Sequence, residues 1–288
     1  MIRTAVFKLC GQLATGPTAV FDQSSASINA PISPPPEKTE SILKLMPILN
    51  EPTTVSSRRA NLESARHRSR KGECYYQTKH RKDGTFDYAS SMQHLAYGRI
   101  ILNASYPAEA FSTGERETGL IVLSGEATAT VEGNETALGR YDAIYIPRDS
   151  SVKVATATTV DLAEFSADVG NRCPLQVVRF AELADNPGLR FSTGGPGNRR
   201  QLNMLLAKNV TAGRLIAGFT ESEQGNWTSW PPHEHAAMLE EMYVYFDMPD
   251  PAYGIQLVYN DTHHPELVTV VRDGDAVMMP SGFHPNVY

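Results

Sequence analysis

The sequence predicts an all-β protein built as two barrels, and three observations carry this prediction. From about residue 75 onward, short segments rich in β-branched and aromatic residues alternate with Gly, Asn and Asp. Few segments have the periodicity of a helix. The tract LGRYDAIYIPRDS at 138–150 resembles DGDAVMMPSGFH at 273–284, because each has a turn, Asp-Ala, an apolar triplet and proline. Many short strands favour a sandwich or barrel, and the repeated tract favours two of them.

The composition limits the compartment and the partners. The chain has 288 residues, of which 41% are hydrophobic, so it can bury a substantial core. Its formal net charge of −6 argues against nucleic acid or an anionic membrane as a partner. The three cysteines show no CxxC spacing, no apolar run reaches the ~20 residues of a membrane span, and the N-terminus makes a poor signal peptide. We therefore expect a cytoplasmic protein with reduced thiols.

Residues 1–74 are predicted to form a poorly ordered, largely irregular extension. The stretch 22–60 is rich in Pro, Ser and Thr, and such a composition buries too little surface to offset chain entropy. Within the extension, SILKLMPIL at 41–49 is expected to be a short amphipathic piece. The basic run 59–71 is expected to be a frayed helix or an arm.

Residues 75–190 are predicted to form the first barrel. Its strand candidates are RIILNASY, TGLIVLSG, ATATVEG, AIYIPR and the segment 152–168, with a hairpin turn at 131–134. The Gly-rich stretch 194–198 is expected to be a flexible joint at the domain boundary. Residues 198–288 are predicted to form the second barrel, from the candidates LNMLLA, RLIAGFTES, EEMYVYFDM, GIQLVYN, LVTVVRDG and DAVMMPSG.

A candidate metal site lies in the last 60 residues. His233 and His235 are two apart, so on a strand both side chains point to the same face. Glu241 opens a strand a few residues later, and His284 follows the turn that ends another strand. Three imidazoles and one carboxylate suit Zn, Mn, Fe, Co or Ni. His263 and His264, in the turn NDTHHPE, are expected to face solvent.

These residues resemble the two motifs of the cupin superfamily. The first motif is Gly, a spacer, HxH, Glu and a later Gly; the second is Gly, Pro-x-Gly, a short gap and His. The matching positions are Gly225, His233, His235, Glu241 and Gly254, and then Gly274, Pro280, Gly282 and His284. The gap before His284 is one residue shorter than the common pattern.

A narrower resemblance is to the 5-deoxy-glucuronate isomerase and 5-keto-4-deoxyuronate isomerase family of inositol and pectin catabolism. It is carried by GNWTSWPPHEH, LEEMYVYF and DGDAVMMPSGFHP. The resemblance implies tandem cupin barrels of the double-stranded β-helix type, with a metal-free first barrel and one divalent metal, preferably zinc, in the second. The implied ligands are His233, His235, Glu241 and His284, with Glu240 as a competitor for the carboxylate position.

The resemblance also implies the reaction, which is the isomerisation of an aldose sugar acid to its ketose. The predicted catalytic residues are Glu240 and Tyr243, with a metal-bound hydroxide or His264 as alternatives. For the substrate carboxylate we expect Arg214, with Arg200 as a second candidate. The other predicted substrate-binding residues are Trp230, Gln256 and Tyr259.

Two departures from the family and two other functions stay open. Family members continue past the position of Tyr288 with strands that close the second barrel, so an exposed edge is expected there unless another segment fills the gap. The long N-terminal extension is also unlike the family. A cupin dioxygenase uses the same donor set, and a non-catalytic metal- or sugar-binding protein is the third reading. We expect a homo-oligomer that binds a small sugar acid.

Overall fold

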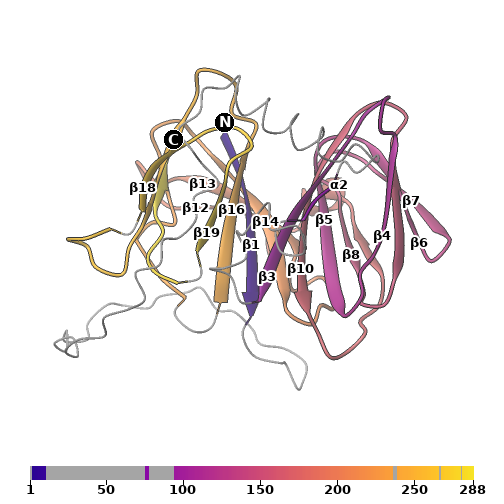
Figure 1. Cartoon of the computed structure of the whole chain (residues 1–288). Helices are drawn as coiled ribbons and strands as arrows, with labels where there is room; N and C mark the ends of the chain where they lie inside the picture. Colours follow the sequence, from indigo (N-terminus) through magenta and orange to yellow (C-terminus); the bar gives the residue numbers. More distant parts are fainter. Residues whose placement is uncertain (1, 11–74, 78–93, 236–238, 266, 280) are drawn as a thin grey trace.

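The computed structural model describes residues 2–10, 75–77 and 94–288, except 236–238, 266 and 280. The described chain is nearly all β, and its four sheets form two units that lie side by side (Figure 1). Each unit combines a six-stranded sheet with a four-stranded sheet. No helix in these residues is long and apolar enough to cross a membrane.

The first unit contains ten strands in two sheets. The six-stranded sheet has the order β11-β8-β5-β10-β3-β2, and the four-stranded sheet has the order β4-β9-β6-β7. A single described helical turn, α2 (Phe180–Leu183), follows the last of them. The strands are β2 Tyr75–Gln77, β3 Leu95–Leu102, β4 Ala108–Ser112, β5 Arg116–Gly125, β6 Ala127–Val131, β7 Asn134–Leu138, β8 Ala143–Ile146, β9 Ser151–Ala155, β10 Val160–Asp168 and β11 Gln176–Val178.

The second unit repeats this layout with strands from both ends of the chain. Its sheets have the orders β12-β13-β14-β1-β16-β19 and β15-β20-β17-β18. The strands are β1 Ile2–Cys10, β12 Arg190–Thr193, β13 Arg200–Leu206, β14 Leu215–Ser222, β15 Trp227–Thr228, β16 Leu239–Phe246, β17 Gly254–Val258, β18 Leu267–Val271, β19 Ala276–Met279 and β20 Asn286–Val287. The strand β3 corresponds to β14, β5 to β16, β8 to β19, and β4-β9-β6-β7 to β15-β20-β17-β18.

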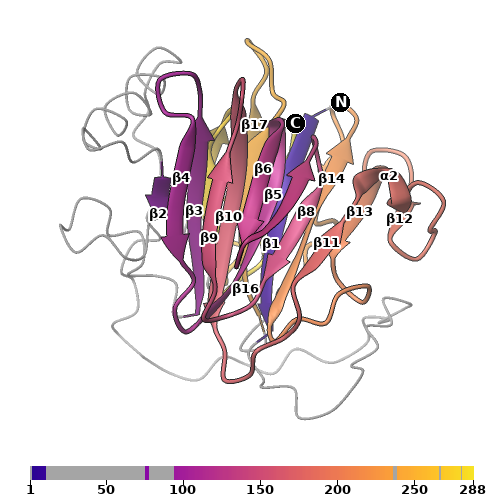
Figure 2. The same cartoon turned by 90° about the vertical axis from the view of Figure 1, so that its right-hand side faces the viewer.

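The two six-stranded sheets pack face to face and share a core. Phe165 of the first unit and Phe219 and Phe246 of the second belong to one buried cluster. Full burial of such a side chain contributes about 1.5–3 kcal/mol. A second cluster fills the first unit, and a smaller third cluster lies inside the second unit. Figure 2, which views the molecule from the side of the first unit, shows that the strands of this unit lie in front of β1, β16 and β14.

The repeated tract marks equivalent turns in the two units, as the sequence predicts. Asp142 Oδ2 accepts a hydrogen bond from the Gly139 N–H at 3.0 Å, and Asp275 Oδ2 accepts one from the Arg272 N–H at 2.6 Å. Each turn leads into a buried four-residue strand, β8 or β19. The hairpin at 131–134 is also confirmed, since Val131 and Asn134 are paired.

Residues 2–10 correct the prediction of an irregular extension. They form β1, which pairs antiparallel with β14 on one side and β16 on the other. The segment IRTAVFKLC contains β-branched and aromatic residues, which suit a strand. Residues 11–74, with the two pieces expected at 41–49 and 59–71, lie outside the described residues. Because β1 is paired on both sides, the predicted exposed edge is absent at this place in the sheet.

The stretch 194–198, expected to be a flexible joint between the two barrels, lies between two paired strands of the second unit. Strands β12 and β13 flank it and pair with each other from Arg190 with Asn203 to Thr193 with Arg200. Gly194 and Gly197 have φ values of 84° and 80°, which the turn requires and side chains rarely adopt. The stretch is therefore the turn of a hairpin inside the second unit, and the boundary between the units precedes Arg190.

Candidate metal centre

His233 and His235 lie in an irregular segment after β15, and the prediction that they lie on a strand is wrong. Pro231 and Pro232 precede the pair and have no N–H groups, so a strand ladder cannot extend through them. The two imidazoles still converge, with ring centroids 5.1 Å apart. His233 Nδ1 lies 3.3 Å from the Pro231 carbonyl oxygen, which orients its ring.

Glu241 comes to the histidines from β16. The alternation of this strand puts Glu241, Tyr243 and Tyr245 on the inner face of the second unit. The Glu241 carboxylate is almost fully buried, and its Oε2 lies 2.9 Å from His235 Nε2 and 3.0 Å from His284 Nε2. One carboxylate oxygen therefore faces two imidazole nitrogens.

His284 completes the cluster from the turn after β19. Gly282 has a φ of 97°, and a Cβ on it would lie 3.0 Å from the Tyr259 carbonyl oxygen, so the turn needs glycine. The His284 ring centroid lies 4.9 Å from that of His233 and 5.4 Å from that of His235. The ligand atoms of the three histidines all lie within 4.8 Å of one another.

The donor set fits a divalent cation. His284 Nδ1 lies 2.8 Å from the Gly282 carbonyl oxygen, so this nitrogen carries the proton and donates it. His284 Nε2 then presents its lone pair to the Glu241 carboxylate, an arrangement of two acceptors that is repulsive without a shared cation. A backbone carbonyl that orients a histidine is a common outer partner of a metal ligand. The four residues predicted as ligands therefore meet at one place, where Glu241 and His284 are buried and His233 and His235 are more exposed.

Tyr243 lies beside the cluster and shares a hydrogen bond with Ser229. The Tyr243 ring centroid is 5.8 Å from that of His284, and its hydroxyl bonds with the Ser229 hydroxyl. Burial, and then the nearby Glu241 carboxylate, raises the pKa of Tyr243 well above its usual value. Sequence reasoning missed Ser229, although it lies on the tract before the HxH pair; its φ of 50° is the feature that only the structure shows.

Gln256, predicted to bind substrate, is fully buried and holds the turn of His284. Its Nε2 donates to the carbonyl oxygens of His284 and Pro285 at 2.9 and 3.2 Å, and its Oε1 accepts from the Tyr245 hydroxyl. Its hydrogen bonds are thus made to the protein. Gln256 orients a predicted ligand, and the missed residue Tyr245 supports it.

Glu240, predicted to be catalytic, is not brought to the cluster. It lies on the opposite face of β16, toward the first unit, where its Oε2 accepts hydrogen bonds from the N–H groups of His94 and Leu95 at 2.9 and 2.8 Å. The physical reason is the period of two in a strand, which turns neighbouring side chains to opposite faces. The same alternation could have separated Glu240 from Glu241 in the sequence.

The remaining predicted residues divide into near and distant ones. Trp230, 39% exposed, lies three residues before His233 and packs against Trp227 with ring centroids 5.2 Å apart. Tyr259 stacks on Phe283, next to His284. Arg214 points toward the first unit, where its guanidinium donates to the Asp168 carbonyl oxygen at 3.2 Å. His264 is exposed and pairs with Asp261.

The fold and the histidine cluster together define a cupin-type protein with a candidate metal site. The chain belongs to the KduI/IolB family, whose sequence model matches residues 70–288.

Relatives and a solved structure agree with this assignment. A 5-deoxy-glucuronate isomerase of Geobacillus thermodenitrificans is 28% identical over 191 residues, covering 60% of this chain and 68% of that protein. The enzyme of the same name in Bacillus licheniformis is 26% identical over 192 residues, covering 60% and 69%. The crystal structure of an IolB-like protein from Salmonella typhimurium LT2 is 22% identical with a TM-score of 0.60, covering 68% of this chain and 78% of that one. This last likeness shows the fold.

Proposed function

We propose that this chain is a metal-dependent aldose–ketose isomerase that acts on a deoxy-uronate such as 5-deoxy-glucuronate. The observation that carries the proposal is the convergence of three imidazoles and the Glu241 carboxylate in the interior of the second unit. Membership of the KduI/IolB family and the names of the relatives support the reaction. In this proposal the two units are tandem cupin barrels, and only the second carries a metal.

The proposed ligands are His233, His235, Glu241 and His284, with zinc as the first choice and Mn, Fe, Co or Ni as alternatives. These residues would hold the ion, which would supply positive charge beside the substrate carbonyl. Of the three side chains predicted to carry a proton, Tyr243 alone lies beside the cluster. We assign its hydroxyl, oriented by Ser229, the role of hydrogen-bond donor to a substrate oxygen.

The polar interior favours a sugar acid over an apolar substrate of a dioxygenase. Around the cluster, Tyr243, Tyr245, Gln256 and Asn286 line the inside of the unit with hydroxyl and amide groups. These groups make hydrogen bonds within the protein and hold the elements that carry the ligands, whereas a pocket for an apolar substrate would be lined by apolar side chains.

Isomerase turnover of the purified full chain on 5-deoxy-glucuronate, followed by NMR of the aldehyde and ketone, tests the proposal. We expect turnover that a chelator removes and that added zinc or another divalent metal restores. Turnover that survives chelation would contradict metal dependence. Oxygen uptake without isomerisation would favour a dioxygenase, and bound metal without turnover on any uronate would favour a binding protein.

A further inference from the structure

Arg200 is a half-buried cation held by backbone carbonyls. It is the first residue of β13, and its Nη1 donates to the Asn198 carbonyl oxygen at 3.0 Å. Its Nη2 donates to the Trp230 carbonyl oxygen at 3.3 Å. These two bonds fix the guanidinium and use only two of its five N–H donors.

No carboxylate of the described residues pairs with Arg200. Other arginines have such partners, as the buried Arg99 has Asp161 at 2.6 Å and the half-buried Arg179 has Asp142 at 2.8 Å. The hydrogen bonds of Arg200 go to neutral carbonyls, and burial lowers its pKa while the neighbouring Tyr243 raises it. A bound anion would compensate this buried charge.

Arg200 contacts the segment that leads to the metal cluster. Trp230 follows Ser229, which bonds to Tyr243, and precedes the two prolines before His233. The chain therefore connects Arg200, through the Trp230 carbonyl and the adjacent Ser229, to Tyr243, whose ring centroid lies 5.8 Å from that of His284. Trp230 is 39% exposed, so the segment that Arg200 contacts lies at the surface of the second unit.

We propose that Arg200 binds the carboxylate of a sugar acid whose carbonyl end reaches the cluster of His233, His235, Glu241 and His284. This assignment rests on the proposed function, and it replaces Arg214, whose guanidinium contacts the first unit. A guanidinium forks onto a carboxylate with two parallel N–H bonds, which an ammonium cannot do. Arg200 is then the residue that selects a uronate over a neutral sugar.

The test compares the binding of D-glucuronate and D-glucose to the metal-loaded full chain by calorimetry. The wild type should prefer glucuronate, and Arg200→Gln should reduce that preference about tenfold or more, the scale of hydrogen bonds to charged groups. Arg200→Lys should keep part of the preference, because it keeps the charge without the fork. The matched controls are Arg199→Gln, at the exposed neighbouring position, and Arg214→Gln, and both should bind like the wild type.

A purely structural role for Arg200 predicts a different result. If the residue only held the Trp230 carbonyl, Arg200→Gln would weaken both sugars equally and lower the metal content, with no change in the preference. That result, a loss of preference in Arg214→Gln, or a wild type without preference would overturn the assignment.

The binding readout is independent of turnover. A wild type that prefers glucuronate through Arg200 but turns over no uronate would remove the isomerase proposal and leave this assignment standing. Turnover on 5-deoxy-glucuronate with an unchanged KM in Arg200→Gln would support the isomerase proposal and remove the assignment of Arg200.

Discussion

The two units share one frame and differ in what their interiors contain. Thr118 of β5 pairs with Ile146 of β8, just as Glu241 of β16 pairs with Met279 of β19. The inner positions Thr118, Leu120 and Val122 of the first unit therefore correspond to Glu241, Tyr243 and Tyr245 of the second. An apolar core fills the first interior, whereas the second holds the histidine cluster and hydrogen-bonded tyrosines.

Each unit contacts the other through a glutamate at the same position of its sheet. Glu117, one residue before Thr118, accepts hydrogen bonds from the N–H groups of Gly213, Arg214 and Leu215, where β14 begins. Glu240, one residue before Glu241, does the same for His94 and Leu95, where β3 begins. Each glutamate thus holds the start of a strand of the other unit. The comparison teaches that Glu240 joins the two units, whereas Glu241 belongs to the candidate metal site.

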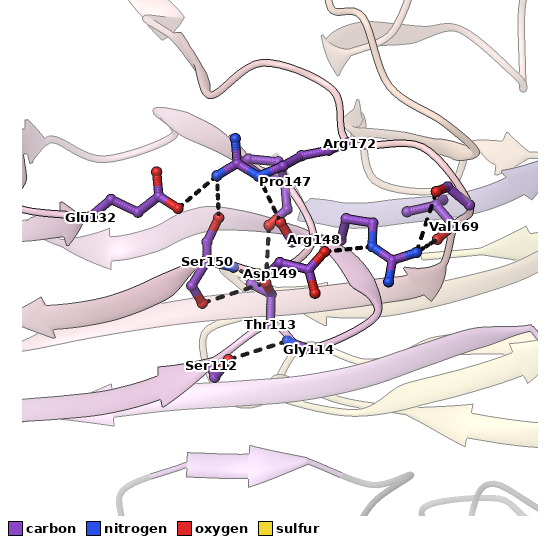
Figure 3. Close-up of polar contacts among 11 residues, drawn as sticks. Ser112, Thr113, Gly114, Glu132, Pro147, Arg148, Asp149, Ser150, Val169 and Arg172 are labelled. Carbon is purple, nitrogen blue, oxygen red and sulfur yellow. Dashed lines mark hydrogen bonds and ion pairs between the residues drawn. The ribbon is translucent and has the colours of Figure 1, made fainter.

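The turn that carries His284 also has a counterpart in the first unit. Counting from the paired strands, Ser151 stands where the second unit has His284, and Asp149, with a φ of 58°, stands at Gly282. Figure 3 shows this turn closed by arginines: Arg148 donates to the Val169 carbonyl, and Arg172 bonds to Ser150 and pairs with Glu132. At this turn the first unit therefore has the exposed Ser151 and a surface network in place of a histidine.

The strand in the middle of each large sheet has a different origin. In the first unit it is β10, between β3 and β5; in the second it is β1, between β14 and β16. Arg3 fixes β1 by an ion pair with Glu221 at 2.7 Å and another with Asp247 at 2.7 Å. Asp247 also accepts a hydrogen bond from Tyr141 of the first unit at 2.7 Å.

The largest effect, on metal content and turnover, should come from removing the Glu241 carboxylate from the interior of the second unit. Glu241→Ala removes the carboxylate that faces two imidazoles, so we expect loss of the metal and a drop in turnover of at least about 100-fold, beyond the usual effect of an outer partner. Thr118→Ala, at the equivalent position, should leave both unchanged. Metal analysis and the isomerase assay measure this, and equal effects of the two substitutions would break the comparison.

Substitution of Glu117 or Glu240, the two glutamates at corresponding positions, should lower the stability of the protein. Glu117→Ala removes the acceptor of three buried or partly buried N–H groups and of the Tyr145 hydroxyl, and Glu240→Ala removes the acceptor of two N–H groups. We expect each to lower the free energy of unfolding by at least about 2 kcal/mol, with the larger loss for Glu117→Ala. Urea denaturation measures the loss, and the Gln variants should recover part of it.

A catalytic Glu240 would give the opposite pattern. In that case Glu240→Gln would abolish turnover without lowering stability. We expect the folded Glu240→Gln protein to keep its metal and most of its activity.

A smaller effect is expected from the support behind His284. Gln256→Leu removes the donor to the His284 and Pro285 carbonyls and the acceptor for Tyr245. We expect the metal affinity to fall about tenfold, at the lower end for outer partners of metal ligands. Competition with a chelator measures the affinity, and an unchanged value would show that the turn is rigid without Gln256.

The smallest effect concerns β1. Arg3→Ala should lower the free energy of unfolding by about 1 kcal/mol, because its partly buried guanidinium joins two carboxylates. The exposed pair of Arg172 and Glu132 is the control, and Arg172→Ala should change stability by less than about 0.5 kcal/mol. Equal values from thermal or urea unfolding would argue that Arg3 does not fix the strand.

The local patterns in the sequence are sufficient to predict most strands and all four candidate ligands. The spacing of His233, His235, Glu241 and His284 matches the two cupin motifs, so their convergence could be expected from the resemblance, although the strand expected for the histidine pair is not formed. The tract shared by 138–150 and 273–284 likewise reveals equivalent turns, because both use an aspartate to accept a backbone N–H.

Pairings between distant segments are harder to read from the sequence. Nothing local to residues 2–10 says that they pair with β14 and β16, more than 200 positions away. The roles of Gln256 and Arg214 depend on partners in other elements, at His284 and Asp168. Burial and hydrogen bonds that cross between elements decide such roles, and composition does not encode them.

Metal analysis of the purified full chain, beside a His235→Ala/His284→Ala variant and a His263→Ala/His264→Ala control, tests the central claim most directly. We predict one divalent ion per chain in the wild type and in the control, and none in the first variant. A wild type that binds no metal at saturating zinc, or a first variant that keeps its ion, would contradict the account.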